Sequence, residues 1–125
     1  MSDEQIVMLL EQILMALESV QRKCAYAQRE DDFLENETGQ EKLDSICMKL
    51  IGVGESLKRI ERFDQSIFQR YPDIPWKKIK GIRDFLSHHY FDLDAGVIFD
   101  ICQHHIDPLL KAIKEILKDV QHRTR

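Results

Sequence analysis

Apolar residues recur three and four positions apart along the N-terminal segment, and this spacing constrains the fold more than any other feature of the sequence. Side chains at this spacing share one face of an α-helix, so the pattern predicts one amphipathic helix over residues 3–28. Polar residues such as Glu11, Gln12 and Glu18 fill the opposite face. The apolar stripe consists of Ile6, Leu9, Leu10, Ile13, Leu14, Leu17 and Val20.

A second stripe of the same kind follows the acidic, turn-forming residues 30–39 and predicts a second long helix. Thr38 and Glu41 have the spacing of a capping box, so we expect this helix to begin near Thr38. Gly52 and Gly54 lie inside it, although each costs about 1 kcal/mol relative to Ala in a helix. Their presence predicts close approach of another helix. The apolar members of the stripe are Leu43, Ile46, Cys47, Leu50, Val53, Leu57 and Ile60.

Prolines divide the next part of the chain. Residues 64–71 fit a short helix, which has to end at Pro72 and Pro75 because a proline biases its predecessor away from helical angles. A new helix is predicted from Trp76 onward. Its buried stripe is predicted to contain Trp76, Ile79, Ile82, Phe85 and Leu86, and its basic flank Lys77, Lys78, Lys80 and Arg83.

The last helical pattern follows two aspartates. Either Asp92 or Asp94 can cap it, and Pro108 should kink it or divide it into two pieces. We therefore predict an all-α fold, an up-and-down bundle of four main helices plus short helices. The chain is expected to form a single domain over residues 1–125, with a frayed polar tail at 121–125.

Composition limits where such a chain works and what it binds. It has 18 basic and 22 acidic residues, a formal net charge of −4, so a polyanion has to be held by a local basic patch. Cys24, Cys47 and Cys102 are odd in number and form no Cys-x-x-Cys pair, which predicts reduced core residues and no disulfide framework. The N-terminus is acidic, and no apolar run reaches the ~20 residues of a membrane span. We expect a cytoplasmic protein that binds neither a membrane nor a cofactor.

Reactive side chains are concentrated between Arg83 and Tyr90. This segment, Arg-Asp-Phe-Leu-Ser-His-His-Tyr, contains a permanent cation, two imidazoles that titrate near neutrality and a phenol. Residues five apart on a helix are rotated by about 140°, so Arg83 reaches the face of His88 because its side chain is long and the helix ends nearby. The segment is the candidate site of chemistry.

Arg83, His88 and Tyr90 have the spacing R-x4-H-x-Y, which resembles the signature of the HepT-like proteins of the HEPN group. Further segments resemble the same family in register from residue 38 to residue 116. These are Gly54-Glu55-Ser56, the segment Tyr71-Pro-Asp-Ile-Pro-Trp76, Gly81-Ile-Arg83 and His89-Tyr-Phe-Asp-Leu-Asp94.

The resemblance implies a homodimer, or a dimer of dimers, that pairs through the reactive helix. It also implies a metal-independent endoribonuclease: His88 moves the proton of an RNA 2'-hydroxyl or of the leaving oxygen, and Arg83 stabilises charge on the phosphate. Family members are toxins paired with a minimal nucleotidyltransferase antitoxin, which is thought to attach AMP to the tyrosine of the motif. In this chain that tyrosine is Tyr90.

Two residues depart from the family pattern. Asp84 stands where the family often has Asn, so a carboxylate near the phosphate site either orients His88 or weakens RNA binding. His89 fills a position that is usually small or acidic, which leaves open which imidazole transfers the proton. Asp84 and His89 are therefore expected to support the two catalytic residues.

Structural interpretations stand beside the functional ones. Arg83 can pair with Asp84 or Glu55, and Glu55 is expected to be buried and hydrogen-bonded. Tyr90 can bury its ring. A metal site at Cys102, His104, His105 and His122 lacks a second ligand pair, so none is expected. The chain can also act as a non-catalytic, substrate-binding partner of a nucleotidyltransferase, or as a helical dimerisation module.

Overall fold

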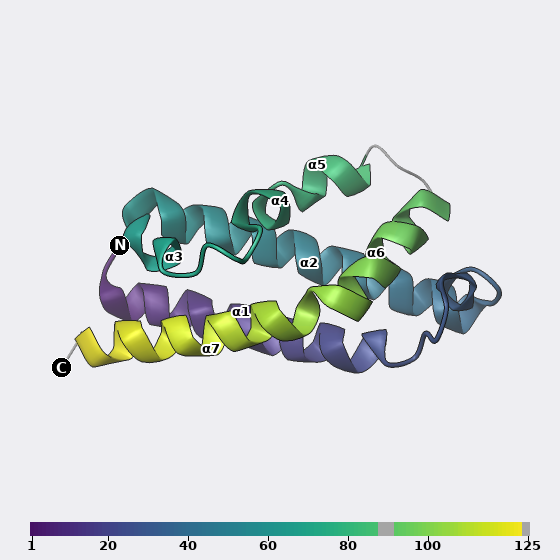
Figure 1. Cartoon of the computed structure of the whole chain (residues 1–125), viewed down its shortest axis with the longest axis horizontal. Helices are drawn as coiled ribbons and strands as arrows, with labels where there is room; N and C mark the ends of the chain where they lie inside the picture. Colours follow the sequence, from purple (N-terminus) through teal and green to yellow (C-terminus); the bar gives the residue numbers. More distant parts are fainter. Residues whose placement is uncertain (88–91, 124–125) are drawn as a thin grey trace.

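The structure, a computed structural model, describes residues 1–87 and 92–123, and every regular element in these residues is a helix. Three long helices, α1 (Asp3–Cys24), α2 (Glu37–Phe63) and α7 (Ile106–Arg123), lie lengthwise along one another (Figure 1). Their apolar stripes form one core, in which Leu10, Leu17 and Ile46 are fully buried. The predicted all-α fold is confirmed. None of the described helices is both long and apolar enough to cross a bilayer.

Shorter helices complete the bundle. They are η1 (Glu30–Phe33), a 3₁₀ turn, followed by α3 (Ser66–Gln69), α4 (Trp76–Lys80), α5 (Ile82–Ser87) and α6 (Asp92–His104). The helix predicted from Trp76 onward is broken at Gly81, so that α4 and α5 are separate pieces. The division of the last helix is confirmed, but it falls at His105. Pro108 lies in the first turn of α7, where its missing N–H has no helical partner to lose.

The N-termini of α1 and α2 have side-chain caps. Ser2 and Gln5 form a capping box at α1, in which each accepts a hydrogen bond from the other's backbone N–H. In α2 the cap is Asn36, whose Oδ1 accepts from the N–H of Gly39 at 2.8 Å. The predicted capping box at Thr38 is therefore wrong, because the chain enters the helix earlier than expected.

Arg123 links α7 to α1 and to the end of α2, at the end of the bundle where the two termini lie. Its guanidinium contacts Asp3 in α1 at 2.9 Å and Asp64, just beyond α2, at 2.8 Å. The hydrogen bond from Ser66 and the guanidinium of Arg123 hold the pKa of Asp64 below its ordinary value. The tail was expected to fray over 121–125, but α7 continues through Arg123, and residues 124 and 125 lie outside the described part.

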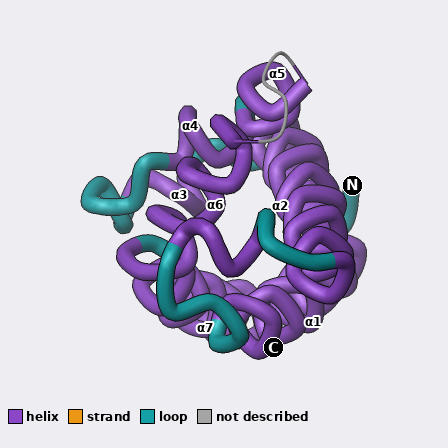
Figure 2. Tube along the Cα trace, turned by 90° about the vertical axis from the view of Figure 1, so that its right-hand side faces the viewer, coloured by secondary structure: helices purple, strands orange, loops and turns teal. Residues whose placement is uncertain are grey.

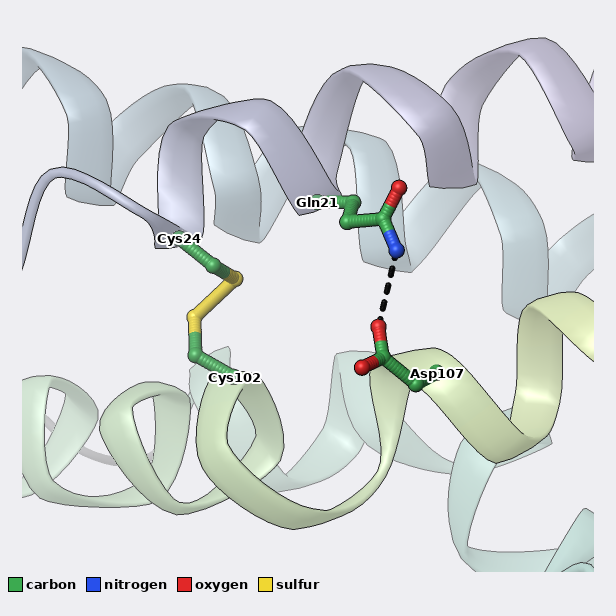
Figure 3. Close-up of a disulfide and its surroundings, with 4 residues drawn as sticks. All are labelled: Gln21, Cys24, Cys102 and Asp107. Atoms are coloured by element: carbon green, nitrogen blue, oxygen red, sulfur yellow. Dashed lines mark hydrogen bonds between the residues drawn. A yellow bond between two sulfur atoms is a disulfide. The ribbon is translucent and has the colours of Figure 1, made fainter.

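A disulfide joins Cys24 at the end of α1 to Cys102 in α6, as Figure 3 shows. The two Cα atoms are 5.3 Å apart, a separation that a disulfide spans without backbone movement. The prediction of reduced cysteines is therefore wrong for this pair. Sequence spacing gave no sign of it because 78 residues separate the two, and only the packing of α6 beside α1 brings them together. Disulfides are typical of oxidising compartments, so the cysteines no longer favour a reducing one.

Reduction of this disulfide should destabilise the protein by about 2–4 kcal/mol, because the bridge restricts a long loop of the unfolded chain. Chemical denaturation with and without reductant measures the change in unfolding free energy. Cys102→Ser should abolish the response to reductant, whereas Cys47→Ser should keep it. Alkylation of all three thiols in the native, unreduced protein would show that the bridge does not form.

Candidate functional site

Close contact between α2 and α4 determines where the reactive segment lies. A Cβ atom on Gly54 would come within 2.6 Å of the backbone oxygen of Ile79 in α4, far too close for any other residue. The prediction of close helix approach is confirmed at Gly54. It is wrong at Gly52, where a Cβ would meet nothing within 4 Å. Gly54 therefore lets α4, and with it α5, lie directly against the middle of α2.

The segment that precedes α4 is fixed by aromatic side chains. Trp76 donates its indole N–H to the backbone oxygen of Tyr71 at 3.0 Å, and its ring packs on Phe68 with centroids 4.8 Å apart. The hydroxyl of Tyr71 donates to Asp119 in α7 at 3.1 Å. Burial and the Asp119 carboxylate raise the pKa of Tyr71, so this donor keeps its proton at neutral pH. These contacts anchor the start of α4 to α3 and α7.

Arg83 in α5 lies beside Glu55, the residue that follows Gly54. The distance from Arg83 Nη1 to Glu55 Oε1 is 3.9 Å, and Lys58 Nζ lies 3.6 Å from the same oxygen. Of the two partners that the structural alternative offered for Arg83, Glu55 is the one seen in this contact. The expected burial of Glu55 is wrong, because its side chain keeps 40% of its exposure. Two cations therefore share one carboxylate at this point of the surface.

The guanidinium of Arg83 remains available to a ligand. Its side chain is 64% exposed, and its distance to Glu55 exceeds hydrogen-bonding range. An exposed pair of this kind contributes about 0–1 kcal/mol, so little free energy holds the arginine to Glu55. Lys77 and Lys78 are exposed in α4, whereas Lys80 is largely buried and bonds to Glu61. Arg83, Lys77 and Lys78 therefore supply exposed positive charge along α4 and α5.

The predicted site is described only in part. Arg83 and Asp84 lie in α5 with both side chains exposed, and α5 leads directly to the next residues of the motif. His88, His89 and Tyr90 lie outside the described residues. The predictions for proton transfer at His88, for support at His89 and for modification of Tyr90 therefore stay predictions.

Other candidate side chains lie elsewhere. The sulfur of Cys102 is in the disulfide, and His104 and His105 at the end of α6 lie 3.9 and 3.4 Å from Asp100. Two hollows of the described residues, about 180 and 690 Å³ in volume, are lined by other parts of the chain and do not include Arg83.

Sequence reasoning overlooked Lys58, which shares Glu55 with Arg83. A signal for it was present, because residues three apart on a helix are neighbours and Glu55 precedes Lys58 by three. The contact with α5, in contrast, depends on how α4 packs on α2, and no local spacing reports that.

The sequence of this chain is similar to those of known proteins. Residues 10–116 match the family model described as "Ribonuclease HepT-like". In Methanocaldococcus jannaschii, the protein named "Putative RNase MJ0127" is 32% identical over 91 residues, 73% of this chain and 70% of its own. A second one, "Putative RNase MJ1216", is 33% identical over 75 residues, 60% of this chain and 58% of its own. No solved structure matches the chain significantly.

Gly54→Ala should lower the free energy of unfolding by about 1–3 kcal/mol, the usual cost of overpacking, because the new methyl group meets backbone. Gly52→Ala is the matched control: its methyl group meets open space, so helix propensity should stabilise the chain by up to about 1 kcal/mol. Denaturant unfolding of dilute protein measures both. Equal effects of the two substitutions would show that α4 does not approach α2 at Gly54.

Proposed function

The chain belongs to the HepT-like ribonuclease family, and from this premise we propose that it is a metal-independent endoribonuclease that acts as a homodimer. The observation that carries the proposal is the family match over residues 10–116, which contains the whole segment from Arg83 to Tyr90. The exposed, loosely paired guanidinium of Arg83 supports it. We treat residues 1–125 as one domain that works in the cytoplasm, where RNA is plentiful.

In this proposal each active site uses Arg83 and His88 from two neighbouring chains. One imidazole, in its neutral form, takes the proton of the RNA 2'-hydroxyl, and another, protonated, gives a proton to the leaving 5'-oxygen. Arg83 binds the phosphate and stabilises the charge that develops on its oxygens. Two chains supply both protonation states without a metal ion. Asp84 and His89 flank this centre as supporting residues.

His88→Ala should lower the rate of RNA cleavage at least about a hundredfold, the usual contribution of a general acid or base. His89→Ala, next along the chain, is the matched control and should change the rate less than about tenfold. Both should be measured by single-turnover cleavage in the presence of a chelator, with circular dichroism to verify the helices. Cleavage that survives in His88→Ala but is lost in His89→Ala would reassign the proton transfer to His89.

Arg83→Lys tests the proposed role of Arg83 in phosphate binding, with the same cleavage assay. Lysine keeps the charge but lacks the planar fork that binds phosphate oxygens in pairs, so cleavage should fall while the fold is retained.

We further propose that the chain is the toxin of a toxin–antitoxin pair, neutralised by a minimal nucleotidyltransferase. AMP attached to the Tyr90 hydroxyl would add a phosphate charge and bulk beside His88 and so exclude the substrate. In the alternative proposal the chain is a non-catalytic, substrate-binding partner of that enzyme. Retention of AMP transfer by a chain that never cleaves RNA would favour the alternative.

Incubation with such a nucleotidyltransferase and ATP should add one or more AMP groups, seen by intact-mass measurement. Tyr90→Phe should remove the adduct, and Tyr71→Phe, a tyrosine at the far side of α4, should keep it. An adduct that persists in Tyr90→Phe would place the modification at another residue.

A further inference from the structure

The outward face of α2 is uncovered in the described structure. Figure 2 shows α2 at the edge of the bundle, between α1 and α5. The residues along this face lie three, four or seven positions apart and are exposed. We call them the α2 crest: Glu37, Glu41, Met48, Gly52, Arg59 and Arg62.

Charge is divided along the crest in a way that suits pairing with itself. Its N-terminal half carries the acids Glu37 and Glu41, and its C-terminal half carries the bases Arg59 and Arg62. Within the described residues none of these four takes part in an intramolecular ion pair, although Arg123, Arg29 and Lys80 elsewhere do. Two copies of α2 laid antiparallel would face acid with base at both ends.

The middle of the crest has the shape that such a crossing needs. Met48 is 75% exposed, somewhat more than the exposed Met8, Met15 and Phe63, and a Cβ at Gly52 would meet nothing within 4 Å. In an antiparallel pair centred between these two residues, Met48 of each chain lies over Gly52 of the other. The absent side chain at Gly52 then makes room for the methionine and allows close approach of the helices.

The register of the pair follows from the same centre. When Met48 faces Gly52, Glu41 faces Arg59 and Glu37 comes close to Arg62, since both members of each pair lie about equally far from the centre. A two-fold axis produces every such contact twice, as an isologous interface requires. The order of acidic, apolar and basic residues along α2 thus fits this one register of the two antiparallel helices.

From these observations we infer that the α2 crest binds the α2 crest of a second copy of this chain in antiparallel orientation. The inference rests on the proposed function in one respect: the interface serves catalysis only if two chains share the site at Arg83. Glu55 also lies on this face, about 8 Å along the axis from the crossing point, so the two Arg83 side chains flank one interface. Asp44 of each chain would then come near the partner's Glu55 and Lys58, which pair with each other.

Charge reversal tests the register. Glu41→Arg and Arg59→Glu should each raise the dimer dissociation constant at least about tenfold, because each creates two like-charge contacts per dimer. The double variant, which restores opposite charges in exchanged positions, should return the constant to within about threefold of the original. Glu115→Arg, an exposed acid on α7, is the matched control and should leave it unchanged. Sedimentation equilibrium measures all four.

Gly52→Gln tests the centre without altering charge. The lone chain has open space at this position, so the substitution should keep or improve helix stability while raising the dissociation constant about tenfold or more. A chain that stays monomeric at all concentrations, single reversals without effect, or a double variant that fails to recover would each overturn the inference. None of these results depends on RNA cleavage. An error in the proposed function would appear in the His88→Ala cleavage test, and an error in the proposed interface would appear in the dissociation constants.

Discussion

The contact between Gly54 and the backbone of Ile79 is the constraint on which the rest of the site depends. It brings α4 against α2 at a distance that admits no side chain, and the short turn at Gly81 then directs α5 along the same helix. Glu55 follows Gly54 and Arg83 follows Gly81 by two, so both reach the surface side by side. The position of the guanidinium is thus fixed by backbone packing and hardly at all by the ion pair that it forms.

Sequence alone predicted those features that depend on periodicity. The apolar stripes of α1 and α2 contained most of the buried residues of both helices, with Leu14 and Cys47 only half-buried, because three- and four-residue spacing reports directly on one helical face. Prediction from the sequence failed for features that depend on tertiary packing. The Cys24–Cys102 bridge and the exposure of Glu55 follow from how helices meet, which local spacing does not record. Gly54 and Gly52 show the same limit, since identical residues two positions apart face a neighbouring helix and open solvent.

Charge is arranged locally in a chain that is acidic as a whole. The net charge of −4 disfavours approach of RNA at long range, but screening confines this repulsion to about 10 Å at ordinary salt. Close to the surface the nearest charges decide, and beside Arg83 these include Glu55, Lys58 and the neighbouring residue Asp84. An antiparallel pairing of two crests would further enclose the acids Glu37 and Glu41 between basic residues, and so remove part of the negative field beside the site.

The weakness of the Arg83–Glu55 pair is what makes it compatible with phosphate binding. At 3.9 Å and with most of the arginine exposed, the pair contributes about 1 kcal/mol at most. Hydrogen bonds from a guanidinium to a charged phosphate contribute about 1.5–3 kcal/mol each and form in pairs. In the proposed function a phosphate would therefore displace Glu55 at modest cost, and Lys58 would remain to neutralise the carboxylate that is left behind. Glu55 thus contributes little to the position of the guanidinium, and it would not compete effectively with a bound phosphate.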